Sequence, residues 1–586
     1  MQHLVDARTK AWTERIGGRT KGFHPEAKKL ALEELCAETG VRIFARCFFL
    51  GVLLEGRAVR GIAIDGAFGP GRLEAQVVID STGDGDVCAA AGAPFRAGRD
   101  ADGLAQPFSL VPGQLQHADA LSFRNFDAGY ADPTHARDVS RAQFVGRALL
   151  RKDAFDAESR MLYVAPVLGV RESRHVATEY VVTLDDQRAL RSFPDAIARA
   201  KAHYDNHAFD YENESLDAAA WLAAAGIRQQ PMCVDIPYRA LVPLGAENLL
   251  VACRAAGFTH DAMCMCRMQR DMQALGEAAA VAAAVALRGR TSVRAADVRA
   301  IQRRLVEREA LPPDVLDGRG AGSSLEPDLE RRDASVAELL LTWGTRNEPA
   351  AQKELFRRGA AAHPGLREAL RGAEAGPREM AAVALALQGL DDGAELLKAM
   401  LRERRQDVAG QTMKTPPRWM GALLLLDKLG PRKLGALELV LGLLNDEPFD
   451  TRKALPAVRV LARHATAEEA LEPLRETLRR VRATAELPAP KACHPLLAES
   501  LYDRRYELEL AVAEALAGFG RPGEAREIAR PYLDDGRAPV RSYARRVAEA
   551  AVSLVEAESV KQNRYSNQKN QEPNKFQEAN SKLQTK

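Results

Sequence analysis

A chain of 586 residues is too long for one hydrophobic core, so several domains are expected. Hydrophobic residues make up 46% and charged residues 28%, which is typical of a globular protein rather than a membrane-embedded or disordered one. The net charge of +2 gives no global electrostatic reason to expect nucleic acid or an anionic membrane as a partner.

The N-terminal residues and the cysteines indicate the cellular compartment in which the protein is expected. Residues 1–10 carry scattered charges without a continuous apolar core, so we expect no signal peptide there, and no stretch approaches the length of a membrane span. Eight cysteines are few for this length and lack the spacing of a disulfide framework, which indicates a reducing compartment. A cytoplasmic protein is therefore expected.

The first hundred residues are expected to form an α/β layer. Leu30, Leu32 and Leu35 stand at helical spacing behind Pro25, which predicts a helix over residues 25–39. Apolar runs separated by glycine turns at Gly51, Gly56, Gly66 and 69–71 predict β segments at residues 41–49, 52–54, 59–64 and 76–79.

The remaining chain changes character several times. Residues 105–228 mix strand and helix patterns, as an inserted α+β substrate domain would, and residues 248–252 form a short apolar strand. Residues 271–287 predict a buried helix, and residues 311–336 have the Pro, Gly and charge content of a linker. Beyond them, helix, glycine and helix recur around Gly389, Gly430 and Gly518, which favours an all-α, HEAT-like solenoid over residues 337–557. Residues 558–586 have almost no aliphatic side chains and are expected to be disordered.

The most informative segment is Val77–Asp86, which reads Val-Val-Ile-Asp-Ser-Thr-Gly-Asp-Gly-Asp. An apolar strand ends there in hydroxyl, glycine and aspartate residues. Ligands of open α/β sheets bind where strands end in this way. The same pattern also occurs in ordinary turns, so other segments must decide between the two interpretations.

Residues 77–94 as a whole resemble the FAD-dependent oxidoreductase family with the glutathione-reductase-like FAD fold, in which Ala usually stands at the place of Ser81. Three further segments resemble the same family in the expected order, over residues 22–310: Gly169-Val-Arg-Glu-Ser-Arg174, Ile236-Pro-Tyr-Arg239 with Asn248-Leu-Leu-Val-Ala-Cys-Arg254, and His260 through Leu275-Gly-Glu-Ala-Ala279.

The resemblance implies a fold class and a division of the chain. It implies an α/β, Rossmann-like FAD-binding domain with an inserted α+β substrate domain, followed by the all-α HEAT-like solenoid. The expected parts are a partial FAD-binding domain (1–104), the substrate domain (105–228), the returning FAD-binding segment (229–310), the linker (311–336), the repeats (337–557) and the tail (558–586).

The resemblance also implies cofactor-binding residues, with FAD as the cofactor. Thr82, Gly83 and Asp84 would line the FAD cleft, and the strand over residues 249–252 would end near the flavin at Arg254. Arg267 and Met268 would lie beside the flavin, and the helix around Leu275 and Gly276 would direct its free NH groups toward the pyrimidine edge of the flavin. The family commonly has Gly at the places of Cys253 and Ala280, so close backbone contact at these two positions is less certain.

The substrate side is expected to use cations and a proton-transfer group. The candidates for it are Arg171, Glu172, Ser173, Arg174 and His260. The alternatives are an ion pair of either arginine with Glu172 or Glu179 on a solvated face, and a core role for His260. Arg239 is interpreted as structural.

Cys264 and Cys266, with Cys253 nearby, invite a metal or redox interpretation. Zinc and iron–sulfur sites use spacings that these cysteines lack, so buried, inert thiols are favoured. Some relatives, which resemble the heterodisulfide reductase A subunit, carry iron–sulfur clusters, but the chain has no ligand motif for one.

A dinucleotide fold of this class opens with a strand and a G-x-G-x-x-G turn that holds the pyrophosphate. The chain has no such turn, because its nearest glycine cluster, residues 66–71, lies between β segments as a hairpin turn. The resemblance therefore predicts an N-terminal truncation, with the first strand and the phosphate turn missing.

Three functions remain open. The first is an FAD-dependent oxidoreductase that moves hydride or electrons between flavin and an unidentified small substrate, for which the arginines favour an anion. The second is a non-catalytic scaffold with a decayed flavin domain, whose repeats bind a protein partner. The third takes the Arg-rich stretches 475–482 and 541–546 as a nucleic-acid surface, but interspersed Glu favours a solvated face.

Overall fold

A computed structural model describes residues 1–17, 19–20, 24–116, 120–123, 129–148, 160–208, 210–228, 230–318, 333–411, 415–484 and 505–550. The predicted disordered tail and the centre of the predicted linker, residues 319–332, lie outside the described residues. None of the described helices combines the length and the apolarity that crossing a membrane requires.

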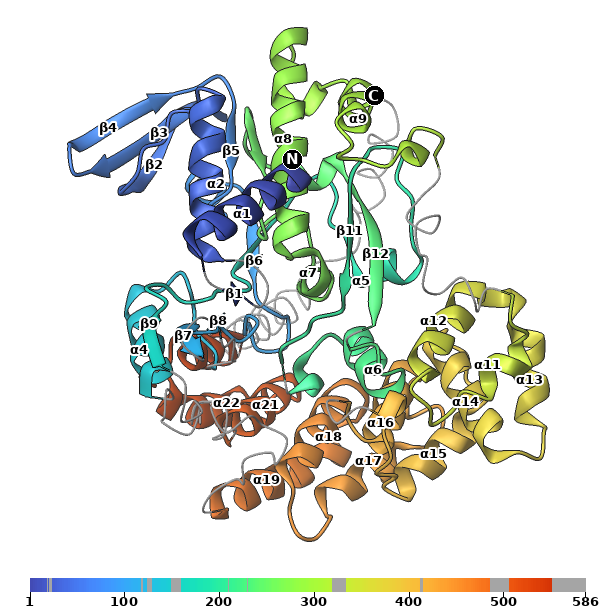
Figure 1. Cartoon of the computed structure of the whole chain (residues 1–586). Coiled ribbons are helices and arrows are strands. Elements are labelled where there is room, and N and C mark those ends of the chain that lie inside the picture. The colour runs from blue at the N-terminus through green and yellow to red at the C-terminus, as the bar shows by residue number, and fades with distance from the viewer. Residues whose placement is uncertain are drawn as a thin grey trace, which may run out of the picture.

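Helices and short strands alternate in the N-terminal half (Figure 1). Its first elements are α1 (Gln2–Ile16), β1 (Arg19–Thr20), α2 (Pro25–Glu38), β2 (Cys47–Glu55), β3 (Ala58–Gly66), β4 (Gly69–Glu74), β5 (Val78–Asp80), α3 (Asp86–Ala90), β6 (Phe95–Ala97), β7 (Pro112–Gln116) and β8 (Ala120–Phe123). They are followed by α4 (Ala136–Ala148), β9 (Arg160–Val164), β10 (Arg174–Val176), α5 (Leu184–Arg188), β11 (Ala196–His203), α6 (Leu216–Ala224), β12 (Pro231–Pro237), β13 (Leu249–Val251), α7 (His260–Cys266), α8 (Gln269–Gly289) and α9 (Val298–Glu307).

The antiparallel sheet β2–β3–β4 confirms most of the predicted β segments but corrects their limits. Residues 41–44 are not a strand, and the turn predicted at Gly51 is wrong, because Gly51 continues β2 with a shift of register after Phe49. A glycine inside a strand accommodates such an irregularity without ending the strand. The predicted hairpin turn is confirmed, since Gly66 pairs with Gly69 between β3 and β4.

The strands β5 and β13 lie side by side and parallel, with Val78 opposite Leu249 and Asp80 opposite Val251. All three residues of β13 are buried, as the apolar run predicted. The described residues form five small sheets of two to four strands. The described residues therefore show no large parallel sheet of the Rossmann-like kind, only this pair and the two-residue parallel pairing of β1 with β8.

Within residues 105–228, three different sheets take part, one of them the pair of β10 with β6. The strands β7, β8 and β9 form a four-stranded sheet with β1, whereas β11 pairs with β12, which follows residue 228 in the chain. The mixed α and β character is therefore present in the structure, and the predicted domain limits stay a prediction.

Helices follow one another through the C-terminal half, and the described residues there contain no strand. These helices are α11 (Val336–Leu340), α12 (Glu348–Arg358), α13 (His363–Leu370), α14 (Ala375–Leu387), α15 (Ala394–Arg402), α16 (Arg418–Leu429), α17 (Leu437–Leu444), α18 (Thr451–His464), α19 (Ala467–Ala483), α21 (Arg505–Gly518) and α22 (Pro522–Ala529). Successive helices pack in an arc below the N-terminal half in Figure 1. Gly389 and Gly430 have positive φ angles where α14 and α16 end, which a glycine allows most readily.

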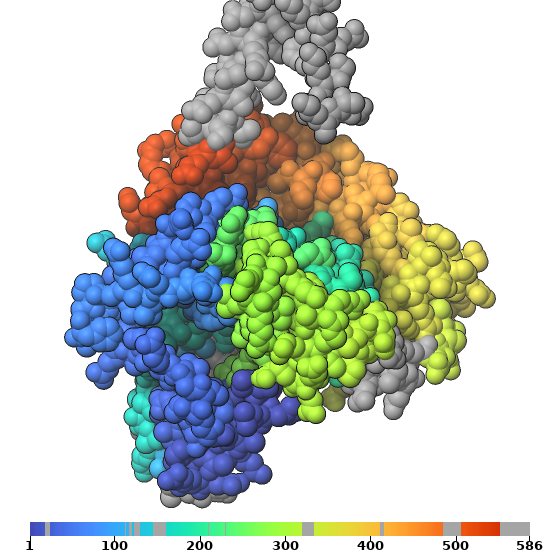
Figure 2. All heavy atoms as spheres, turned by 90° about the horizontal axis from the view of Figure 1, so that it is seen from above, coloured from blue at the N-terminus to red at the C-terminus, as the bar shows by residue number. Residues whose placement is uncertain are grey.

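The two halves share a large hydrophobic core cluster, so the linker predicted over residues 311–336 does not separate two independently packed units. Leu222 of α6 and Leu423 of α16 belong to the same buried cluster. A β-carbon on Gly421 of α16 would lie 2.9 Å from the Cα atom of Ala224, so the two helices approach closely. Figure 2 shows the orange and red atoms directly against the blue and green ones.

Polar contacts also join the halves. In α18, Nη2 of Arg459 donates hydrogen bonds to the Ala101 carbonyl oxygen (3.5 Å) and to Oδ1 of Asn213 (3.3 Å). Nη1 of Arg546 donates to the Asp100 carbonyl oxygen at 2.8 Å. The helices of the C-terminal half therefore hold two loops of the N-terminal half, one around residue 100 and one around residue 213.

Candidate functional site

The turn that follows β5 is held in shape by the buried carboxylate of Asp80. Its Oδ1 atom accepts hydrogen bonds from the backbone NH of Thr82 (3.0 Å) and from the Thr82 hydroxyl (2.8 Å). Its Oδ2 atom accepts one from the Cys88 NH at 2.9 Å. A carboxylate that accepts several such bonds fixes the backbone around it. Asp80 thus organises the segment that carries Thr82, Gly83 and Asp84.

Gly83 and Arg254 are in close contact where the two parallel strands end. Gly83 has a φ of +89°, and a β-carbon there would lie 2.5 Å from Nη1 of Arg254. Nη2 of Arg254 also donates to Oδ1 of Asp84 at 2.6 Å. The structure therefore brings together Thr82, Gly83, Asp84 and Arg254, a group that we call the strand-end group.

Arg174 joins the strand-end group rather than the other substrate-side candidates. Its Nη1 atom donates to the Asp84 carbonyl oxygen at 2.9 Å and to Oδ1 of Asp86 at 2.7 Å. Its guanidinium lies 5.2 Å from the centre of the Phe95 ring. The ion pair considered with Glu179 is not formed by Arg174, since Glu179 pairs with Arg294.

The beginning of α8 differs from the expectation. Met268 is the N-cap and the helix starts at Gln269, so its free NH groups belong to the first turn. Leu275 and Gly276 lie in the second turn and cannot direct free NH groups at a ligand, so that expectation is wrong. Arg267, just before the helix, donates to the carbonyl oxygen and to Oδ2 of Asp205, both at 3.0 Å.

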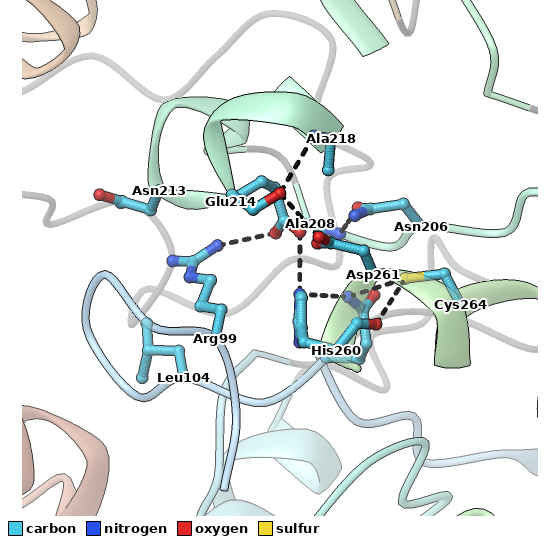
Figure 3. A network of polar contacts seen from close by, with 12 residues as sticks. Arg99, Leu104, Asn206, Ala208, Asn213, Glu214, Ala218, His260, Asp261 and Cys264 are labelled. Carbon is cyan, nitrogen blue, oxygen red and sulfur yellow. Dashed lines mark hydrogen bonds and ion pairs between the residues drawn. The ribbon is translucent and has the colours of Figure 1, made fainter. Parts of the chain in front are cut away.

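A buried network centres on His260, the first residue of α7. Nδ1 of His260 lies 2.7 Å from Oε1 of Glu172, and Nε2 lies 2.8 Å from Oε2 of Glu214. The same Glu172 oxygen is 2.6 Å from Nε2 of His175. Figure 3 shows Glu214 between Arg99 and His260, with Asp261 and Cys264 alongside.

Opposite charges determine the protonation of this network. Burial alone would lower the pKa of His260, but Glu172 and Glu214 raise it well above its ordinary value. Burial would likewise raise the pKa of Glu172, but His260 and His175 hold it well below its usual range. A protonated His260 donates from both nitrogens, one to each carboxylate.

Arg99 provides the far end of the network and is almost completely buried. It donates to both oxygens of Asp102 (2.8 and 2.6 Å), to Oε1 of Glu214 (3.1 Å) and to Asp210. Three carboxylates thus surround one guanidinium. Arg99 is fully engaged by these protein carboxylates and holds Glu214 against His260.

Arg171 and Ser173 flank Glu172 in the chain and are buried. Arg171 donates to the carbonyl oxygen of Pro107, away from the hydrogen bonds of His260. The Ser173 hydroxyl has no hydrogen-bond partner among the described residues. Glu172 and Arg174 are two residues apart, so their Cα atoms are separated by at most about 7 Å. One short segment thus connects the His260 network to the strand-end group.

A cavity of about 490 Å³ adjoins the network, and its wall includes Arg96, His175, Ser215, His260 and Asp261. Burial raises the pKa of the Asp261 carboxyl to about 6. The cavity is large enough for a small organic molecule, and pockets of this kind hold ligands by a few polar groups in a mainly apolar wall.

The sequence model of a family described as FAD dependent oxidoreductase matches residues 1–158 and 136–305, which together are more than half of the 586 residues. The chain belongs to the FAD dependent oxidoreductase family. No curated protein matches the chain significantly. The four sequence segments that resemble this family lie within the matched residues.

Membership of this family implies FAD as a cofactor, and the strand-end group has features that suit one side of FAD. Gly83 has no side chain at the turn, and Nε of Arg254 is a buried donor without a hydrogen-bond partner among the described residues. A second such orphaned donor is Nε of Arg267. Buried donors of this kind suit the oxygens of a dinucleotide.

The three cysteines that invited a metal or redox interpretation are buried thiols, as predicted. Cys253, Cys264 and Cys266 are all buried, and burial raises the pKa of Cys253 to about 11. Burial also raises the pKa values of Cys264 and Cys266. A thiol rather than a thiolate is therefore present at each position, and none of them belongs to a metal-ligand cluster of the described residues.

Asp80, Arg99, Glu214 and His175 are functional candidates that the sequence analysis missed. Asp80 ends the apolar strand and could have been recognised there, because a carboxylate at a strand end commonly orders the following turn. Glu214 carries no local signal, since it contacts His260 across 46 residues of chain. Arg239, interpreted as structural, forms an ion pair with Asp195 at 2.9 Å.

Proposed function

We propose that the protein is an FAD-dependent oxidoreductase that exchanges hydride or electrons between flavin and a small anionic substrate. The observation that carries the proposal is the strand-end group, because the parallel ends of β5 and β13 place Gly83 against Arg254 within residues that match the family. Ligands of open α/β sheets bind at such strand ends.

Thr82, Gly83, Asp84 and Arg254 would hold FAD on this side, with Arg267 and Met268 beside the flavin. The first-turn NH groups of α8, after Met268, are suited to an electron-rich edge of a ligand because of the positive end of the helix dipole. When bound, the flavin supplies two-electron redox chemistry that no amino-acid side chain provides.

The substrate would occupy the cavity beside His260. Arg171 and Arg174 would supply positive charge for an anion. His260 would form the polar part of the cavity wall that orients a substrate oxygen, and Glu172 would hold His260 from behind that wall. Arg99 does not bind the substrate, because its own carboxylate partners already surround it. Its part is to hold Glu214 in place.

Titration of the purified chain with FAD tests the cofactor assignment, with quenching of flavin fluorescence as the measurement. Asp84→Asn removes the ion pair with Arg254 and is expected to weaken FAD binding by about tenfold or more, since hydrogen bonds between charged groups contribute about 1.5–3 kcal/mol. Glu55→Gln is the matched control, because Glu55 pairs with Arg60 on an exposed strand end. Absence of any saturable FAD binding by the unmodified chain would overturn the proposal and favour a scaffold role.

A further inference from the structure

Three side chains converge on one point of the His260 network. Oε1 of Glu172 lies 2.6 Å from Nε2 of His175 and 2.7 Å from Nδ1 of His260. One ligand atom from each residue falls within 4.8 Å of the other two. In a metal site with bonds of about 2.0–2.2 Å, ligand atoms are about 3 Å apart. Small outward shifts of these three atoms would make room for one cation.

Two of the three side chains are already oriented by a second hydrogen bond. Oε2 of Glu172 accepts from the backbone NH of Gln106 at 2.7 Å, which leaves Oε1 for the shared point. Nε2 of His260 faces Glu214 at 2.8 Å, which leaves Nδ1 for it. Carboxylates that hold the far nitrogen of an imidazole in this way are the usual second shell of a metal site.

His175 presents Nε2 to the same point from β10, which pairs with β6. Its Nδ1 atom is buried and has no hydrogen-bond partner among the described residues. A neutral imidazole that binds an ion through Nε2 carries its proton on Nδ1, so His175 would hold the ion without a second hydrogen bond of its own.

Two of the three side chains adjoin a cavity. His175 and His260 both form part of the wall of the 490 Å³ cavity. A cation bound by three protein ligands would keep free coordination positions toward that cavity, as sites that bind a water or a substrate oxygen do.

We propose that Glu172, His175 and His260 bind one divalent transition-metal ion, Fe²⁺ or Zn²⁺ in class. Two imidazoles and one carboxylate suit such ions, whereas Mg²⁺ and Ca²⁺ prefer oxygen ligands alone. The ion would lie between Nδ1 of His260, Nε2 of His175 and Oε1 of Glu172. This inference does not depend on FAD binding.

A second group, Glu214, His260 and Asp261, also lies within reach of one ion and shares His260. It offers only one imidazole, and Asp261 already accepts a hydrogen bond from Ser215 at 2.6 Å. The two groups make different predictions, because His175 belongs only to the first and Asp261 only to the second.

The experiment is a titration of the chelator-treated chain, without FAD, with Zn²⁺ by calorimetry and with Co²⁺ by visible absorption. We expect one equivalent of metal ion to bind. The visible absorption bands of bound Co²⁺ should be those of an ion with a low coordination number. His175→Ala is expected to weaken Zn²⁺ binding by about 100-fold or more, since loss of outer-shell partners alone costs about 10–100-fold. Asp261→Asn should bind Zn²⁺ as the unmodified chain does.

His464→Ala, on α18 beside Asp427, controls for loss of any histidine. If His175→Ala fails to fold, Glu172→Gln serves in its place, since it keeps the shape and removes the anionic ligand. Binding of less than one equivalent, or equal Zn²⁺ affinity in the unmodified chain and in the folded ligand variant, would overturn the proposal. A loss confined to Asp261→Asn would also overturn it, in favour of the second group.

Discussion

Gly421 of α16 packs against Ala224 of α6 so closely that a β-carbon on Gly421 would lie 2.9 Å from the Ala224 Cα atom. The backbone, rather than a flexible side chain, occupies that space. The contact lies between the N-terminal half and the repeats, and it belongs to the region of the shared hydrophobic core. The packing between the two halves therefore leaves no room for even one additional methyl group at Gly421.

We expect Gly421→Ala to lower the free energy of unfolding by about 1–3 kcal/mol, because overpacking forces the two helices apart. Urea denaturation followed by far-UV circular dichroism measures the effect. A variant as stable as the unmodified protein would show that α6 and α16 do not approach in solution as they do in the structure.

Gly276→Ala is the matched substitution and is expected to act in the opposite direction. Gly276 lies inside α8, and nothing lies within 4 Å of the position of its β-carbon. Alanine restricts the unfolded chain and favours the helix, so we expect about 0.5–1 kcal/mol of added stability in the same denaturation assay. A destabilised Gly276→Ala would indicate a close neighbour at this position.

Gly83→Ala and Gly92→Ala separate backbone strain from the effect on the strand-end group. Both glycines have positive φ angles, +89° and +81°, so both substitutions cost roughly 1–2 kcal/mol of strain. Only at Gly83 would the new methyl group meet the Arg254 guanidinium. We expect FAD affinity to fall by about tenfold or more in Gly83→Ala and to stay unchanged in Gly92→Ala. Equal affinities in a fluorescence titration would remove Gly83 from the cofactor edge.

Asp271 makes stability depend on pH. Burial raises its pKa to about 6 from an ordinary 3.8, against the opposing effect of Arg270, and the thiols of Cys233 and Cys266 lie nearby. The folded state thus binds a proton that the unfolded state has lost between these values, so this contribution to stability declines as pH rises from about 4 to 6.

Asp271→Asn is therefore expected to raise the free energy of unfolding at pH 7.5 by on the order of 1–3 kcal/mol and to leave it nearly unchanged at pH 4. Urea denaturation at the two pH values measures the difference. An equal effect at both would assign the change to lost hydrogen bonds at the start of α8 instead.

Local patterns predicted the elements that short-range chemistry determines. The apolar runs before Asp80 and Ala252 predicted two strands and the polar edge where they end. The helix α1 escaped notice because only Val5 and Thr9 are buried in it, and its ion pair to α2 through Arg8 and Glu38 has no local signature.

The parts of the site and of the core that the sequence did not predict depend on contacts between residues far apart in the chain. Glu172, Glu214 and His260 meet across 46 to 88 residues, so their convergence depends on the packing of separate elements. The start of α8 was placed two residues late, at Asp271 instead of Gln269, because its N-cap Met268 has no capping side chain that would mark a helix start. The shared core was missed because helical periodicity shows that a face is buried, but not against what.

The contacts of Arg459 constrain how the sequence of this protein can evolve. The two loops that it holds, around Ala101 and Asn213, carry Arg99 and Glu214, which brace His260. An exchange of the helical array for a different one by recombination would release both loops at once. Substitutions on the helical surface around Arg459 therefore constrain which substitutions these two loops can accept.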